Sequence, residues 1–131
     1  MSKKNYIINS DIKSFKKKIE IESDKSLSIR WALLASQASG ISIAENLLKS
    51  EDVLNTLKCL KKLGIKILLK KNLCKIYGNG LNGYKYKKSI ILDAGNSGTL
   101  ARLLLGLLVH SKTNIKLIGD KSLSKRDFLR V

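Results

Sequence analysis

Long apolar runs, cysteine and arginine are all scarce in this sequence. No apolar run approaches the roughly 18 residues of a membrane span, and the lysine-rich start lacks the apolar middle of a signal peptide. Cys59 and Cys74 lack the spacing of metal ligands, so we expect structural thiols in a reducing compartment. These absences predict a cytoplasmic protein with no membrane partner, no metal and no cofactor.

The scarcity of arginine bears on the formal charge of +16, which by itself favours a nucleic-acid partner. The 26 basic residues comprise 22 lysines and only four arginines, and no zinc knuckle, arginine stripe or aromatic-basic stacking motif is present. We therefore expect no nucleic-acid partner. Arg30, Arg102 and Arg126 instead fall inside glycine- and serine-rich motifs, where their planar donors suit an anion.

The hydrophobic pattern alternates between strand and helix, and 131 residues suffice for one domain with a core. It predicts a strand at 17–22, a helix that buries Leu27, Trp31, Leu34 and Ala38 before Gly40, and a strand at 41–44. Ser50 is expected to cap a second helix that ends at Gly64 and buries a further apolar row, Val53, Leu57 and Leu60. A hairpin at 65–69 and 74–78 would complete a βαβαββ unit.

A second, incomplete unit is predicted from about residue 89. Strands at 89–94 and 114–119 flank a helix expected to bury four leucines, Leu100, Leu103, Leu104 and Leu107. A further helix is expected over 122–131, where the sequence stops without a cap. The chain therefore looks cut off within its second unit.

Two near-identical octads, SDKSLSIR at 23–30 and GDKSLSKR at 119–126, share six of their eight residues. Each stands where a strand is expected to enter a helix, whose unpaired N–H groups favour an anion. Ser26 and Arg30 share one helix face, and Lys25 adds a third donor at the turn. The second octad offers four donors in the same predicted arrangement, Lys121, Ser122, Lys125 and Arg126.

Between the octads, Gly95 and Gly98 bracket Asn96-Ser97 at another predicted strand-to-helix turn. Glycine lets the backbone come close to a ligand. The motif is neither a Walker A sequence nor GxGxxG, so no nucleotide class is indicated. The sequence predicts three anion-binding turns of related design.

Four ordered motifs then resemble the 3-phosphoshikimate 1-carboxyvinyltransferase (EPSP synthase) family. They are DKSLSIR at 24–30, SEDVLNTLKCLKKLGIKI at 50–67, AGNSGTLARLLLGLL at 94–108 and GDKSLSKR at 119–126. The resemblance implies an α/β fold of repeated βαβαββ units, the inside-out α/β barrel of the enolpyruvyl transferases, here truncated. Residues 17–131 would form part of an N-terminal domain, with one unit at about 17–78 and an incomplete one from about 89. Residues 1–16 would associate with a second, missing domain.

The resemblance implies transfer of the enolpyruvyl group from phosphoenolpyruvate to the 5-hydroxyl of shikimate 3-phosphate, releasing phosphate, in an enzyme that is monomeric at full length. By motif match, Lys25, Ser26 and Arg30 would bind shikimate 3-phosphate, while Lys25, Gly98 and Arg126 would contact phosphoenolpyruvate. The acid/base carboxylates of the family lie in the missing part, so no catalytic residue is expected here and the piece alone should be inactive. A basic nucleic-acid-binding module and an inactive remnant stay open as alternatives.

One departure from the family pattern concerns Arg126. Family members commonly have Arg-Pro-Met in the last motif, where this chain has Arg126-Asp127-Phe128. A carboxylate paired with Arg126 would weaken the hold of that arginine on an anion. Arg102, in the glycine motif, is interpreted as structural.

Overall fold

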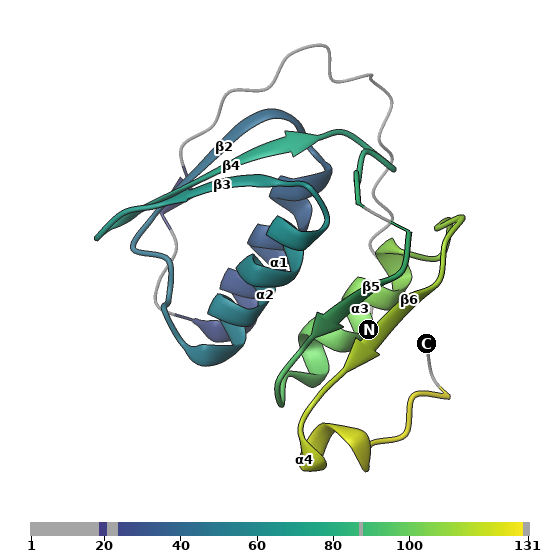
Figure 1. Cartoon of the computed structure of the whole chain (residues 1–131). Helices are drawn as coiled ribbons and strands as arrows, with labels where there is room; N and C mark the ends of the chain where they lie inside the picture. Colours follow the sequence, from purple (N-terminus) through teal and green to yellow (C-terminus); the bar gives the residue numbers. More distant parts are fainter. Residues whose placement is uncertain (1–18, 21–23, 87, 130–131) are drawn as a thin grey trace, which may run out of the picture.

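A computed structural model describes residues 19–20, 24–86 and 88–129 (Figure 1). The predicted N-terminal segment 1–16 lies outside the described residues, as do the ends of the predicted strand 17–22. Two sheets and four helices are present in the described part.

The first sheet has four strands in the order β1-β2-β4-β3. Strand β1 (Ile19–Glu20) pairs in parallel with β2 (Ser39–Glu45), and β4 (Leu73–Asn79) pairs antiparallel with both β2 and β3 (Lys66–Leu69). Helices α1 (Lys25–Gln37) and α2 (Glu51–Lys62) connect them in the order βαβαββ. The predicted hairpin and the order of the first unit are confirmed.

The second sheet pairs β5 (Ile90–Asp93) in parallel with β6 (Ile115–Ile118) through helix α3 (Gly98–Leu107). One turn of helix, α4 (Lys121–Ser124), follows β6. This order repeats the first four elements of the preceding unit, as predicted. The mixed α/β architecture with repeated units is thus confirmed.

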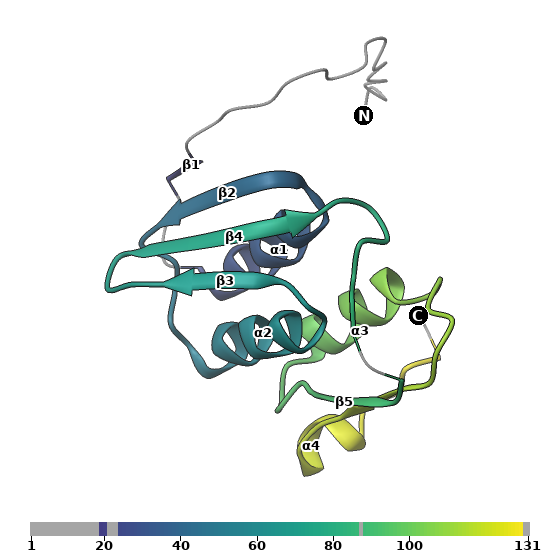
Figure 2. The ribbon, with the colours of Figure 1, turned by 45° about the horizontal axis from the view of Figure 1, so that its top comes forward.

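The helices lie on the inner sides of the two sheets, where they meet one another (Figure 2). Helices α1 and α2 cover one face of the four-stranded sheet, α2 also contacts β5, and α1 contacts α3. The largest fully buried apolar side chains come from every layer: Ile29, Val53, Leu60, Leu63, Ile76, Leu92, Leu100 and Leu104. Each fully buried leucine or isoleucine contributes about 2 kcal/mol through removal of apolar surface from water.

Helix α2 follows its sequence pattern closely. Val53, Leu57 and Leu60 are buried, and Gly64 follows the helix with a φ of +86°, the left-handed conformation that favours glycine. Ser50 occupies the N-cap position, but its hydroxyl makes no hydrogen bond to the helix. The helix start is therefore stabilised by the acidic first turn, Glu51 and Asp52, against the positive end of the helix dipole.

The predicted buried face of α1 is wrong for its two leucines, whereas Trp31 and Ala38 are partly buried. Leu27 is 56% exposed and Leu34 is 70% exposed, whereas Ile29 and Leu33 are buried together with small residues, Ser28, Ala32, Ala35 and Ser36. Small side chains let α1 approach β4 so closely that a Cβ on Gly78 would lie 2.4 Å from the Ala35 carbonyl oxygen. Ser36 Oγ is satisfied within the core, at 2.6 Å from the Leu33 carbonyl and 2.8 Å from Tyr84 Oη. The spacing of the large apolar residues therefore assigned Leu27 and Leu34 to the wrong side of the helix.

Two boundaries and one buried face also differ from the sequence prediction. Helix α1 ends at Gln37, and Gly40 lies inside β2 with a φ of +112°. On α3, Leu100 and Leu104 are buried, but Leu103 is 38% exposed and Leu107 is only half-buried. The helix expected over 122–131 stops after Ser124.

Within the described ranges, no helix is both long and apolar enough to cross a membrane. The two cysteines are free and buried, which agrees with a structural role. Burial raises the pKa of the Cys59 thiol, and likewise that of Cys74, to about 11.

Leu33 and Leu34 are neighbours that test the corrected face of α1. In the 131-residue chain, Leu33→Ala should lower the free energy of unfolding by about 3 kcal/mol, because it leaves a cavity in the core. Leu34→Ala is the matched control and should cost less than about 0.5 kcal/mol. Urea denaturation followed by circular dichroism measures both, and equal costs would contradict this placement of α1.

Cys59 and Cys74 should resist alkylation in the native protein. Because the pKa of each thiol is raised to about 11, the reactive thiolate is scarce below that pH. Iodoacetamide at pH 8 should therefore modify them only after urea is added, as followed by intact-mass spectrometry. Rapid native modification of either cysteine would show that its site is open to solvent.

Candidate functional site

The start of α1 is set by Asp24, whose Oδ1 accepts a hydrogen bond from the Leu27 N–H at 2.6 Å. This cap places Lys25 as the first helical residue. Lys25 Nζ lies 3.0 Å from Asp52 Oδ2, at the start of α2, and the carboxylate side chain is only 12% exposed. The ion pair therefore joins the starts of two helices and fixes the half-exposed ammonium of Lys25.

Ser26 and Arg30 lie on one side of α1, as predicted. Arg30 Nη1 donates to the Ser26 carbonyl oxygen at 3.1 Å, and Arg30 is exposed. The structure thus brings Lys25, Ser26 and Arg30 together within the first two turns of one helix. Two cations and a hydroxyl at the positive end of a helix form a surface that favours an anion.

The turns that follow β5 and β6 lie against each other. The Asp120 N–H donates to the Gly95 carbonyl oxygen at 2.8 Å, and Gly95 has a φ of +57°. Ser97 caps α3, with its Oγ accepting from the Leu100 N–H at 3.2 Å. Since β5 and β6 are parallel neighbours, their carboxyl ends deliver both helices to the same edge of the sheet.

Gly98 and Arg126 are brought together at this edge. A Cβ built on Gly98 would lie 2.6 Å from Arg126 Nη1 and 3.4 Å from Arg102 Nη1, so two guanidinium groups border the first residue of α3. Among the residues that the structure describes, neither arginine forms an ion pair with a carboxylate. Two unneutralised cations at a helix start are a second surface suited to an anion.

The second octad differs from the first in where its arginine lies relative to the helix. Arg126 lies beyond the single turn of α4, so it does not share a helix face with Ser122, and that part of the prediction is wrong. Asp127 Oδ1 accepts from the Leu129 N–H at 2.8 Å instead of pairing with Arg126. The departure at Asp127 therefore leaves the guanidinium of Arg126 available to a ligand.

The two residue sets lie at or near helix starts. The starts of α1, α2, α3 and α4 all lie on the lower side in Figure 1. No hydrogen bond or ion pair in the described part joins Lys25, Ser26 or Arg30 to Gly98 or Arg126. They are two subsites on one surface rather than one continuous cluster.

Sequence reasoning missed Asp52 and Arg102. Nothing in the local sequence pattern links Asp52 to Lys25. Arg102 was interpreted as a structural residue of the glycine motif, and its position one helical turn from Gly98 is the sequence signal for its place beside that residue. Both contacts arise from packing between elements that are distant in the chain.

The described residues include no group of three or more His, Cys, Asp or Glu side chains that could hold a metal ion. Two surface hollows of about 430 and 500 Å³ lie toward the far end of α3, beside Leu108 and Thr113. Neither is lined by a candidate residue. The candidate surface is thus open in this chain and is built from cations and helix starts.

Comparison with known proteins finds relatives in one enzyme family. The family model described as EPSP synthase (3-phosphoshikimate 1-carboxyvinyltransferase) matches residues 10–131. The 3-phosphoshikimate 1-carboxyvinyltransferase of Syntrophomonas wolfei is 40% identical over 124 residues, which are 95% of this chain and 29% of that protein. The protein of the same name from Persephonella marina is 43% identical over 122 residues, covering 93% and 28%.

A solved structure of EPSP synthase from Acinetobacter baumannii matches with a TM-score of 0.73 and 38% identity, over 86% of this chain and 26% of that one. The chain therefore spans between a quarter and a third of the length of the relatives it matches. The family model covers most of the sequence, and the fold matches part of the solved enzyme. This chain belongs to the EPSP synthase (3-phosphoshikimate 1-carboxyvinyltransferase) family.

Proposed function

We propose that this chain supplies part of the substrate site for transfer of the enolpyruvyl group from phosphoenolpyruvate to the 5-hydroxyl of shikimate 3-phosphate, with release of phosphate. The main observation behind the proposal is that Arg126, which follows α4, lies against Gly98 at the start of α3. Both substrates are polyanions. The two cationic subsites on one surface suit two phosphate-bearing ligands bound side by side.

In this proposal Lys25, Ser26 and Arg30 bind shikimate 3-phosphate, while Lys25, Gly98 and Arg126 contact phosphoenolpyruvate. Lys25 belongs to both sets by motif match, and Asp52 holds its ammonium at the start of α1. The chain offers donors and positive charge but no assigned acid/base pair. Its contribution is to orient the substrates and to neutralise their charge.

The remaining assignments follow from the length of the relatives. We propose that residues 17–131 form part of an N-terminal domain and that the acid/base residues lie in sequence that the relatives have beyond the matched region. Residues 1–16 would associate with a second domain. The natural full-length enzyme is proposed to be a cytoplasmic monomer that needs no metal or cofactor.

The direct test is phosphate release by the natural full-length protein supplied with both substrates. Release that requires both substrates together supports the proposal, and absence of release from a folded protein would refute it. The isolated 131 residues should give none, because they hold only part of the site. A nucleic-acid-binding role would instead appear as binding that falls steeply with salt, through release of counterions.

Arg30→Ala in the full-length protein should weaken shikimate 3-phosphate more than phosphoenolpyruvate. Loss of charge-assisted hydrogen bonds to a phosphate should cost about 2 kcal/mol, or roughly thirtyfold in Kd. Isothermal titration measures both affinities, with Lys70→Ala, an exposed lysine between β3 and β4, as the control. Equal loss for both substrates would count against assigning Arg30 to one of them.

Gly98→Ala should lower the affinity for phosphoenolpyruvate without unfolding the protein. The new Cβ would clash with the flexible end of Arg126, at 2.6 Å from Nη1, and would lie 3.4 Å from Arg102 Nη1, so the guanidinium of Arg126 must move while the backbone stays in place. We expect a roughly tenfold rise in the Kd of phosphoenolpyruvate and an unchanged Kd of shikimate 3-phosphate. Gly106→Ala is the matched control, because its Cβ would enter open space on the same helix; an effect of equal size there would refute the assignment.

A further inference from the structure

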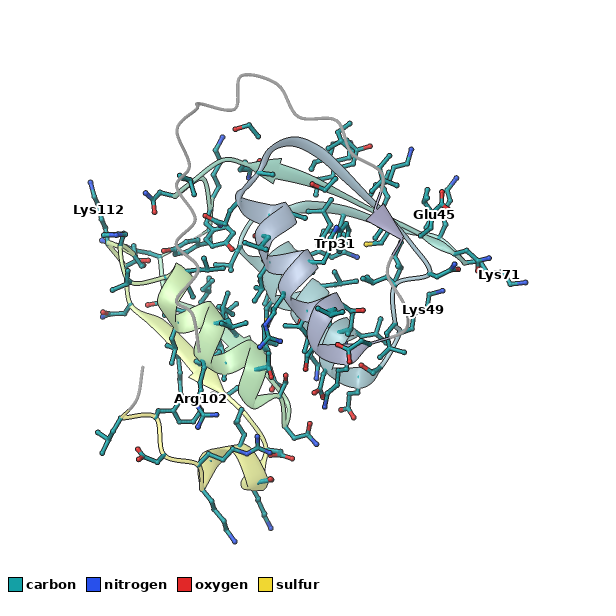
Figure 3. All side chains as sticks on the ribbon, turned by 180° about the vertical axis from the view of Figure 1, so that it is seen from behind. Trp31, Glu45, Lys49, Lys71, Arg102 and Lys112 are labelled. Carbon is teal, nitrogen blue, oxygen red and sulfur yellow. The ribbon has the colours of Figure 1, made fainter. Side chains whose placement is uncertain are left out.

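Arg102 reaches from α3 to the chain segment that follows α4. Its Nη2 donates to the Asp127 carbonyl oxygen at 2.9 Å, and its guanidinium carbon lies 5.4 Å from the centre of the Phe128 ring. Figure 3 shows Arg102 between α3 and that segment. One side chain of α3 therefore makes both a hydrogen bond and a cation-π contact with the two residues that follow Arg126.

The segment needs such a contact because regular structure ends just before it. Helix α4 stops at Ser124, and the Arg126 N–H donates to the Leu123 carbonyl oxygen as the last backbone bond of that turn. The Asp127 carboxylate is engaged locally with the Leu129 N–H. Phe128 is half-buried at the edge of the core. The direction in which Arg126 points thus depends on where Asp127 and Phe128 are held.

Electrostatics alone would not keep Arg126 in place. The terminal nitrogens of Arg102 and Arg126 both border Gly98, and like charges at that range repel. One donor of Arg102 is bonded to the Asp127 carbonyl oxygen, and its planar guanidinium contacts the Phe128 ring. That engagement fixes Arg102 and, through Asp127 and Phe128, keeps Arg126 against Gly98.

We propose that Arg102 is a positioning residue, which clamps the Asp127–Phe128 segment so that Arg126 stays against Gly98 and the site binds its phosphate-bearing ligand tightly. The ligand assignment rests on the proposed function, but the clamp does not. A guanidinium is required for this role. Lysine has the charge, but it lacks the planar group that donates in its plane while it stacks on a ring.

The test uses the natural full-length protein and four variants at the clamp. Arg102→Gln and Arg102→Lys should each raise the KM for phosphoenolpyruvate about tenfold through loss of a charged hydrogen bond. Phe128→Leu should raise it about threefold through loss of the ring contact, while Phe128→Tyr retains the ring and should restore it. The KM for shikimate 3-phosphate should stay constant throughout. Lys116→Ala, an exposed lysine of β6, controls for loss of surface charge.

A merely structural role for Arg102 would give a different pattern. A lower fraction of folded protein reduces kcat and leaves both KM values unchanged, whereas the clamp predicts a change in one KM. An Arg102→Lys variant with the KM of the natural protein would overturn the proposal, because charge alone would then suffice. Equal rises in both KM values would overturn it as well.

Hydrogen exchange separates failure of the clamp from failure of the proposed function. The Leu129 amide, bonded to Asp127 Oδ1, should exchange at least about fivefold faster in Arg102→Gln, because local protection follows local structure. If the natural protein binds no phosphoenolpyruvate, the proposed function fails, and this exchange rate still decides the clamp. Unchanged exchange of Leu129 would overturn it.

Discussion

A cap at the junction of strand and helix is the interaction on which the rest of this structure depends. Asp24, Ser97 and Asp120 each stand just before a helix, and the side-chain oxygen of each accepts the N–H three residues on, at 2.6, 3.2 and 2.7 Å. Each cap satisfies one of the orphan donors of the helix and leaves others directed outward. Because the strands deliver their helices to the same side, three positive helix ends share one surface, and that surface is where the candidate residues lie.

Close packing of small residues between α1 and β4 stabilises this surface. Helix α1 approaches β4 through Ala35 and Gly78, and larger residues at these positions would separate the helix from the sheet. The buried hydroxyls of Ser28 and Ser36 find partners at the Leu48 N–H and at the Leu33 carbonyl and Tyr84 hydroxyl, so the polar atoms carry little penalty. The exposed faces of α1 and α3 retain apolar residues such as Leu34 and Leu103.

The charged contacts affect the positions of the cationic side chains more than they affect the stability of the fold. A half-exposed pair such as Lys25–Asp52 contributes about 1 kcal/mol or less, yet it fixes an ammonium between the starts of α1 and α2. The cation-π contact between Arg102 and Phe128 likewise contributes only modestly to stability at its distance. Such contacts restrict where cations point, and a site for two polyanions depends on that restriction.

The sequence by itself determined the order of the elements, the family and most of the candidate residues. Caps, turn glycines and anion-binding motifs such as Asp24-Lys25-Ser26 are local, and their chemistry is readable within a few residues. Only the tertiary structure decided which face of α1 is buried, where α4 ends, and how Arg102 and Asp52 meet Phe128 and Lys25. These features depend on contacts between segments far apart in the chain. The spacing of residues along one helix does not determine these features, because the burial of a side chain depends on which element packs against its helix.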